Sequence, residues 1–340
     1  MAFVMDDWLE LACPTCKATL EGNAGSSSLH CTRCGQAYAI EHGIPDLRIA
    51  PDPYISVLGD VAKARALHRE FGERDFAGII DLYYAMTPEV PEPQAMLNKS
   101  RMLGGTSRAD VALASWEEGF GTLGTIGRML DIGCGEAPLV VAAARRGAQV
   151  AGVDIGFRHI TMGQKQVAQE GLRAPLIAAC AEALPFPDAT FDVVTIMHAL
   201  ELFRDQARAL SEAFRVTRPG GRILVAAPNR TSLGPDPHIG IPGGGLLPRS
   251  LVGLVSRLQM ARPPHRRLLT AGSLRRELRT AGFADVRVGI PGLSASQRAQ
   301  FSGVLRLAAD GYGGLRTAPV ARTVLRAIGP LLQASATRPR

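Results

Sequence analysis

The chain has 340 residues, of which 46% are hydrophobic and 20% charged, and this length is enough for two or three domains, one with a sizeable core. No stretch approaches the roughly 18 uninterrupted apolar residues of a membrane-spanning helix, and the first residues lack the basic start and apolar run of a secretory signal. The composition argues against a membrane-spanning protein, and we expect a soluble, cytoplasmic one.

The net charge of +7 is unevenly distributed. Residues 218–340 contain 19 arginines, no lysine and four acidic residues, a net charge of +15, whereas the preceding residues carry −8. Such a basic segment can attract RNA, anionic lipid headgroups or phosphorylated substrates, although a solvated arginine-rich surface has the same composition.

The N-terminal region contains a cysteine motif typical of a metal site. Its spacing is C-x2-C-x14-C-x2-C, formed by Cys13, Cys16, Cys31 and Cys34. Two such knuckles can present four thiolates to one tetrahedral Zn2+ at about 2.3 Å, and a pair of disulfides is the less favoured alternative in a reducing cytoplasm. Because cysteines take all four positions, the site is closed, and we expect the Zn2+ to be structural.

The sequence around these cysteines continues into a short strand and a Gly-Ile-Pro turn, in CPTCKATLEG and LHCTRCGQAYAIEHGIPDLRI. In these features residues 9–49 resemble the Trm112-like zinc ribbon. The resemblance implies a partner or appended module of methyltransferases that carries no chemistry itself.

The following segment has apolar residues at helical spacing and predicts a helical cap or linker over residues 50–114. Four large side chains in and just after this segment could line a substrate pocket: Tyr83, Tyr84, Met86 and Trp116. Because large apolar side chains at helical spacing usually pack in the core, we favour a core role for them.

From residue 127 onward, apolar runs alternate with helical patterns, which predicts an α/β fold with a Rossmann-like, doubly wound and mostly parallel sheet. The expected strands are 128–132, 148–155, 174–179, 191–197, 221–227 and 285–290, and the expected helices lie near 138–146, 157–171, 204–217 and 273–282. Ligands of such sheets bind beyond the carboxyl ends of the strands, near the first strand. The glycine-containing bend LDIGCGEAP falls at this place.

Two ligands compete for this bend, because a dinucleotide site also has Gly-x-Gly after its first strand and an acid ending the second. Asp154, 19 residues after Gly135, suits a ribose hydroxyl in either case. Pro138 stands at the third glycine of the dinucleotide motif, and Asp131 places a negative charge where a pyrophosphate would approach. Both positions favour a cationic ligand over a dinucleotide.

Four blocks, LDIGCGEAP, VAGVDI, AEALPFPDATFDVV and EAFRVTRPGGRILVAAPN, resemble those of class I S-adenosylmethionine-dependent methyltransferases in order and spacing. The resemblance covers roughly residues 115–290, which we expect to form the S-adenosylmethionine-binding domain. It implies that the bend approaches the methionine moiety, that Asp154 binds the ribose and that the later residues contact adenine and the donor methyl. The implied cofactor residues are Asp131, Gly133, Cys134, Gly135, Asp154, Ile155, Cys180, Ala181, Glu182 and Met197.

Three features depart from the family pattern. Cys180 stands where the family often has an aspartate that accepts a hydrogen bond from adenine, and Leu202 replaces a common histidine. No seventh strand is evident after residue 290, so we expect residues 291–340 to form a helical, basic C-terminal extension.

The sequence is less informative about the acceptor. His198, at the end of the fourth strand, and His238, in a long substrate loop over about 228–270, are candidate bases, with a structural role as the alternative for each. Asp236 could orient His238. The stretch LVGLVSRLQMARPPHRRLL is either a helix packed on the sheet or an amphipathic membrane-surface helix.

We therefore expect a methyltransferase acting on a small-molecule or lipid-like acceptor, with O- or N-methylation favoured over C-methylation. The first alternative is an RNA methyltransferase that uses the arginine-rich C-terminal third. The second is a noncatalytic cofactor-binding or partner protein.

Overall fold

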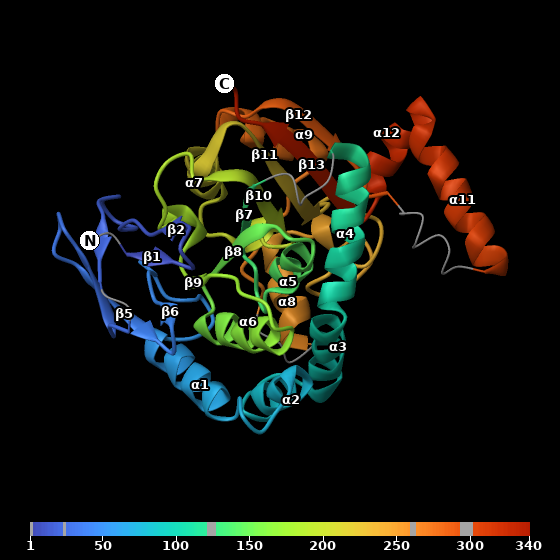
Figure 1. Cartoon of the computed structure of the whole chain (residues 1–340). Coiled ribbons are helices and arrows are strands. Elements are labelled where there is room, and N and C mark those ends of the chain that lie inside the picture. The colour runs from blue at the N-terminus through green and yellow to red at the C-terminus, as the bar shows by residue number, and fades with distance from the viewer. Residues whose placement is uncertain (1–2, 23–24, 121–126, 259–262, 293–301) are drawn as a thin grey trace.

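A computed structural model describes residues 3–22, 25–120, 127–258, 263–292 and 302–340 of the chain. Figure 1 shows a small β-rich N-terminal unit on one side, a central sheet between helices, and two C-terminal helices that extend from the body. The α/β class expected from the sequence is confirmed.

The N-terminal unit is a ribbon of short antiparallel strands, as expected for a small metal-stabilised module. The unit contains a two-stranded sheet and a four-stranded sheet. The strands are β1 Val4–Met5, β2 Leu9–Glu10, β3 Leu20–Glu21, β4 Ser28–Cys31, β5 Ala37–Glu41 and β6 Ile44–Pro45.

Four helices follow the ribbon and wrap one side of the molecule (Figure 1). They are α1 Val57–Arg69, α2 Phe76–Ala85, α3 Glu92–Leu103 and α4 Gly105–Phe120. Tyr83 and Trp116 are buried, in line with the preference for a core role. The helix α4 runs beside the sheet and reaches the edge at which the central strands end.

The central sheet has seven strands in the order β12-β13-β11-β10-β7-β8-β9. Its strands are β7 Arg128–Ile132, β8 Gln149–Asp154, β9 Leu176–Ala178, β10 Phe191–Met197, β11 Thr217–Pro228, β12 Ala284–Gly289 and β13 Leu331–Thr337. The covering helices are α5 Pro138–Arg145, α6 Phe157–Gln169, α7 Gln206–Val216 and α9 Ala271–Thr280. The pairs among β11, β10, β7, β8 and β9 are parallel, so the carboxyl ends of these strands meet at one edge.

The C-terminal segment differs from the expectation of a helical extension. It contains α11 Gly303–Thr317 and α12 Pro319–Ile328, but residues 331–337 then form β13, the seventh strand. This strand runs antiparallel to both β11 and β12 and lies between them. Its partners are far away in the sequence, so local periodicity gave no indication of the pairing.

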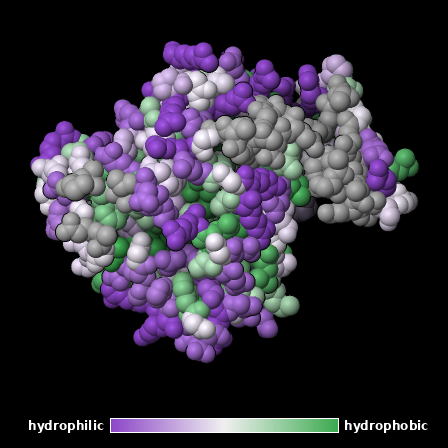
Figure 2. Space-filling model, in the orientation of Figure 1, coloured by the Kyte–Doolittle hydropathy of each residue, from purple (hydrophilic) through white to green (hydrophobic). Residues whose placement is uncertain are grey.

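The helices α11 and α12 form an arm that projects from the body (Figure 1). Several of its apolar side chains are exposed, and Figure 2 shows hydrophobic colour at the outer edge of the arm beside hydrophilic side chains. Throughout the described part of the chain, the helices are too short or too polar to cross a membrane.

The ribbon packs directly on the central sheet. The Leu47 amide donates to the Ala178 carbonyl at 2.8 Å, and Lys17 forms an ion pair with Glu212 at 2.7 Å. Apolar side chains of the ribbon and of the sheet also belong to one continuous core. The two units are therefore joined at an apolar interface.

A buried ion network fixes the connection between ribbon, α1 and α6. The fully buried Asp60 carboxylate accepts hydrogen bonds from Arg48 at 2.6 Å, from Arg158 at 2.9 Å and from the Phe157 amide at 2.8 Å. Burial alone would raise the pKa of Asp60, but Arg158, the Phe157 amide and Arg48 outweigh it and hold this pKa below its usual value. Asp60 is therefore ionised at neutral pH.

We expect Asp60→Asn to lower the free energy of unfolding by about 3 kcal/mol, because it removes the buried charge that Arg48 and Arg158 share and leaves each of them with one carboxylate, Asp46 and Asp52 respectively. Asp81→Asn, whose side chain is 65% exposed and paired with Lys99, should cost less than about 1 kcal/mol. Because the folded pKa of Asp60 is lowered, the difference between wild type and Asp60→Asn should shrink as pH falls through that pKa. Urea unfolding at several pH values measures the stability of both variants. Equal losses of stability in Asp60→Asn and Asp81→Asn would contradict the role of Asp60.

Candidate functional site

The glycine-containing bend after β7 is held close to the neighbouring strand. The amides of Gly133 and Cys134 both donate to the Val153 carbonyl, at 2.8 and 3.0 Å. Gly133 has a φ of 77°, and a Cβ atom there would lie 2.3 Å from the Cβ atom of Ala199. Only glycine fits this conformation and this spacing, so the bend leaves backbone exposed to the space above the sheet.

Asp154 connects the bend to the start of α6. Its carboxylate accepts hydrogen bonds from the amides of Gly135 at 3.0 Å and Gly156 at 2.8 Å. Burial raises the pKa of Asp154, although His159 and these amides oppose the shift. This carboxylate is thus oriented toward the ligand side of the bend before any ligand arrives.

A cavity of about 330 Å³, which we call the glycine-bend cavity, lies above these groups. This volume is in the range of ligand sites, roughly 300–1,000 Å³. Six predicted cofactor residues line it: Gly133, Gly135, Asp154, Ile155, Ala181 and Glu182. The structure therefore brings residues from three separate sequence blocks to one cavity.

Three other predicted cofactor residues lie behind the cavity wall. The Asp131 carboxylate is buried between β7 and β10, where it accepts a hydrogen bond from Thr195 at 2.7 Å. Cys134 is buried, and Cys180 is buried with its thiol 3.6 Å from the Ala50 carbonyl. Burial, opposed by Thr195, raises the pKa of Asp131 to about 7.

The cavity also contains an ionisable pair that the sequence patterns did not indicate. His159 Nδ1 lies within hydrogen-bond distance of Glu136, one residue beyond Gly135, and both side chains line the cavity. Burial alone would raise the pKa of Glu136, but His159, a backbone hydrogen bond and Arg158 together outweigh it and lower this pKa. Glu136 lies inside the glycine block, so its position was visible in the sequence, whereas its pairing with α6 was not.

A second cavity of about 390 Å³, which we call the β10 chamber, begins where β10 ends. Met197 and His198 line it together with residues of α4 and with Leu331 and Leu332 of β13. His198 also lines the glycine-bend cavity, so the two spaces meet at this residue. The chamber walls are mostly apolar, with Arg108 as a charged exception.

His198 is held in an unusual conformation. Its φ of 54° lies in the left-handed region, which non-glycine residues rarely adopt outside functional sites and turns. Its side chain is open to both cavities, yet dense surrounding protein reduces its solvation and lowers its pKa, with Glu201 opposing the shift. The imidazole is therefore neutral at pH 7 and able to accept a proton.

His238 lies elsewhere and faces Glu201 on η3 (Leu200–Leu202), at 3.7 Å between Nε2 and Oε1. Neither His238 Nε2 nor Glu201 Oε2 has a hydrogen-bond partner within the described ranges. Asp236 accepts from the His238 backbone amide at 2.9 Å and pairs with Arg266, so it does not contact the ring. Sequence reasoning missed Glu201, which stands one residue before the noted Leu202.

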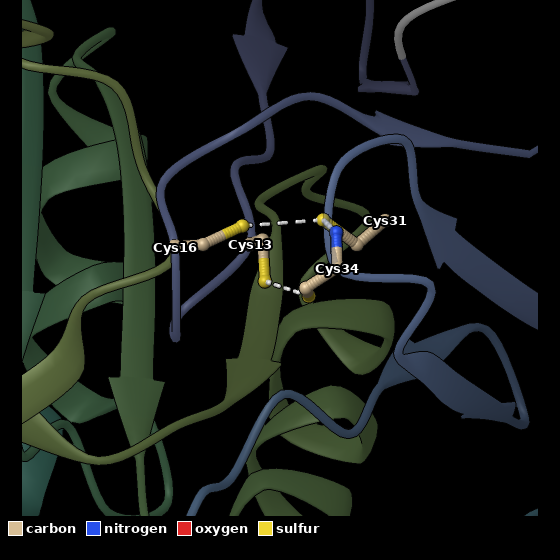
Figure 3. A group of neighbouring side chains, drawn as sticks. All are labelled: Cys13, Cys16, Cys31 and Cys34. Carbon is tan, nitrogen blue, oxygen red and sulfur yellow. Dashed lines mark hydrogen bonds between the residues drawn. The ribbon is translucent and has the colours of Figure 1, made fainter.

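The four ribbon cysteines converge on one point, as Figure 3 shows. Their sulfur atoms all lie within 4.8 Å of one another, with Cys13 and Cys34 at 3.7 Å and Cys16 and Cys31 at 3.4 Å. Four ligands around Zn2+ at about 2.3 Å would be separated by about 3.8 Å. The site thus fits a tetrahedral metal ion with thiolate ligands.

Two family models match the chain, one in the ribbon and one in the central sheet domain. Residues 130–225 match the family model described as a methyltransferase domain, and residues 11–43 match that of the Trm112p-like proteins. The chain carries a methyltransferase domain. Together with the sheet and the four-cysteine cluster, these matches confirm the resemblances derived from the sequence blocks.

Several curated relatives of the methyltransferase domain carry the names of quinone methyltransferases. The chain is 38% identical over 100 residues to a demethylmenaquinone methyltransferase of Thermus thermophilus, covering 29% of this chain and 46% of the relative. It is also 38% identical over 104 residues to a ubiquinone biosynthesis O-methyltransferase of Sinorhizobium medicae, covering 31% and 42%. The chain therefore spans less than half the length of these relatives.

Among solved structures, an S-adenosylmethionine-dependent methyltransferase from Mesorhizobium loti is 21% identical, with a TM-score of 0.44. The match covers 66% of this chain and 98% of that one.

We expect Gly133→Ala to destabilise the protein more than Gly147→Ala, because both glycines have a positive φ but only Gly133 faces a close neighbour. The left-handed conformation should cost each variant roughly 1 kcal/mol, and crowding against Ala199 should add about 1–3 kcal/mol to Gly133→Ala. Chemical unfolding measures the difference, and equal stabilities would show that the bend is not closely packed.

Proposed function

We propose that the protein transfers a methyl group from S-adenosylmethionine to a small, largely apolar acceptor. The observation that carries this proposal is the junction at His198 between the glycine-bend cavity and the β10 chamber. A donor and an acceptor held in adjoining spaces can be aligned for direct transfer, which is the main requirement of the reaction.

The glycine-bend cavity would hold the cofactor. Gly133 and Gly135 would allow close approach of the methionine moiety, and Asp154 would accept hydrogen bonds from the ribose hydroxyls. A buried Asp131 with a pKa near 7 favours a cationic ligand nearby, since a positive charge would stabilise its ionised form. Cys180 does not line the cavity, so Glu182, which does, or a backbone carbonyl would accept the hydrogen bond of the adenine amino group.

S-adenosylmethionine supplies an electrophilic methyl group when bound. His198, neutral and open to both spaces, would take a proton from a hydroxyl or amine of the acceptor. Arg108 on α4 would stabilise negative charge that develops on the acceptor.

The apolar walls of the β10 chamber favour a small or lipid-like acceptor over an RNA base. The relatives with quinone methyltransferase names support a quinone-like acceptor class, and these names include both O- and C-methyltransferases. The proposal commits to the class of acceptor and leaves oxygen, nitrogen and carbon as acceptor atoms.

The four ribbon cysteines would hold one structural Zn2+, which would stabilise a unit too small to build a core alone. Because all four ligands come from cysteine, the metal would take no part in methyl transfer.

We expect the wild type to bind S-adenosylmethionine in isothermal titration calorimetry and Asp154→Asn to raise Kd by about 10- to 100-fold, because the ribose contacts involve a charged acceptor. Asp188→Asn, whose side chain is 73% exposed, should bind as the wild type does. No binding by the folded wild type would contradict the proposed function.

We expect His198→Gln to lower kcat about 100-fold with little change in KM, and to remove the acid limb of the pH–rate profile. His238 lines neither cavity, so His238→Gln should keep that limb. If His238→Gln abolished it and His198→Gln did not, the assignment of the base would be reversed.

We expect one zinc per chain by elemental analysis, and its loss together with a lowered Tm in Cys13→Ser and Cys31→Ser. Cys180→Ala should retain the metal. Full metal occupancy in both ribbon variants would exclude the four-cysteine site.

A further inference from the structure

A third cavity, of about 530 Å³, lies beside the glycine-bend cavity and shares Phe203, Arg204 and His265 with it. We call it the arginine cavity. Its basic lining residues are Arg204, Arg230, Arg249, Arg266, Arg267 and His265. No acidic residue lines it in the part of the chain that the structure describes.

The charges in this cavity are only partly compensated by the protein. Arg266 pairs with Asp236, and Arg267 pairs with Glu277 at 2.9 Å. Neither Arg230 nor Arg249 forms an ion pair within the described residues. Several guanidinium groups around one space repel one another, and an anion with several oxygens would relieve this repulsion through paired hydrogen bonds.

An amphipathic helix begins at the rim of the arginine cavity. The helix α8 (Arg249–Leu258) contributes Arg249 and Val252 to the lining. Leu251, Leu254 and Leu258, at helical spacing, are 44%, 52% and 76% exposed. A helix with arginines and exposed leucines is suited to the interface between headgroups and acyl chains.

From these features we propose that the arginine cavity binds the phosphoryl headgroup of an anionic lipid, with the leucine face of α8 against its acyl chains. The surrounding segment has a strongly positive net charge, which matches an anionic membrane surface. RNA fits less well, because RNA sites stack several bases on aromatic side chains, whereas the described lining residues include only two aromatic rings, those of Phe203 and His265. The proposal does not depend on methyl transfer.

The test is cosedimentation of the full chain with vesicles of phosphatidylglycerol in phosphatidylcholine, with pure phosphatidylcholine vesicles as reference. Arg230→Ala/Arg249→Ala should weaken binding about 10- to 30-fold, since each arginine near an anionic surface contributes about a factor of five. Arg276→Ala/Arg279→Ala removes the same charge from a separate depression on α9 and should bind within about twofold of the wild type. Unchanged Tm and S-adenosylmethionine affinity would show that the variants are folded.

Two further measurements are needed. One distinguishes contacts with the headgroup from contacts with the acyl chains, and the other distinguishes binding of lipid from binding of other anions. Leu254→Gln/Leu258→Gln should weaken vesicle binding but leave pyrophosphate binding, measured by calorimetry, unchanged. Equal loss in both arginine pairs, or no loss in either, would overturn the proposal. The proposal would also be overturned if the protein bound pyrophosphate or single-stranded RNA through Arg230 and Arg249 but did not bind vesicles.

Discussion

The Asp60 carboxylate is the contact on which the arrangement of this molecule depends. It joins Arg48 at the exit of the ribbon to Arg158 and the Phe157 amide at the start of α6. Arg48 also donates to the Ile155 carbonyl at 3.1 Å, on the wall of the glycine-bend cavity. A single buried charge thus connects the ribbon, the helical segment and the candidate cofactor site.

This connection gives the ribbon a physical role without assigning it any chemistry. The ribbon covers the β9 edge of the sheet and shares its core, and its exit carries the arginine that orients Asp60. A metal that orders the ribbon would therefore also stabilise the start of α6, which follows directly on Asp154 and Gly156.

The sequence predicted the parts of the structure that depend on local patterns. The glycine bend, Asp154 and the central strands β7 to β12 follow from residue spacing, because turns and strand periods are set by neighbouring residues. The pairing of β13 between β11 and β12 brings together residues more than 40 positions apart, and no local pattern encodes it. The same holds for the Glu136–His159 pair, for Glu201 beside His238, and for the contribution of α4 to the β10 chamber.

The central claim is that the two cavities meeting at His198 form one donor and acceptor site. The most direct measurement is a crystal structure of the protein with S-adenosylhomocysteine. The account predicts the ligand in the glycine-bend cavity, with its ribose on Asp154 and its sulfur directed toward His198 and the β10 chamber. A ligand bound elsewhere, or a sulfur directed away from that chamber, would contradict it.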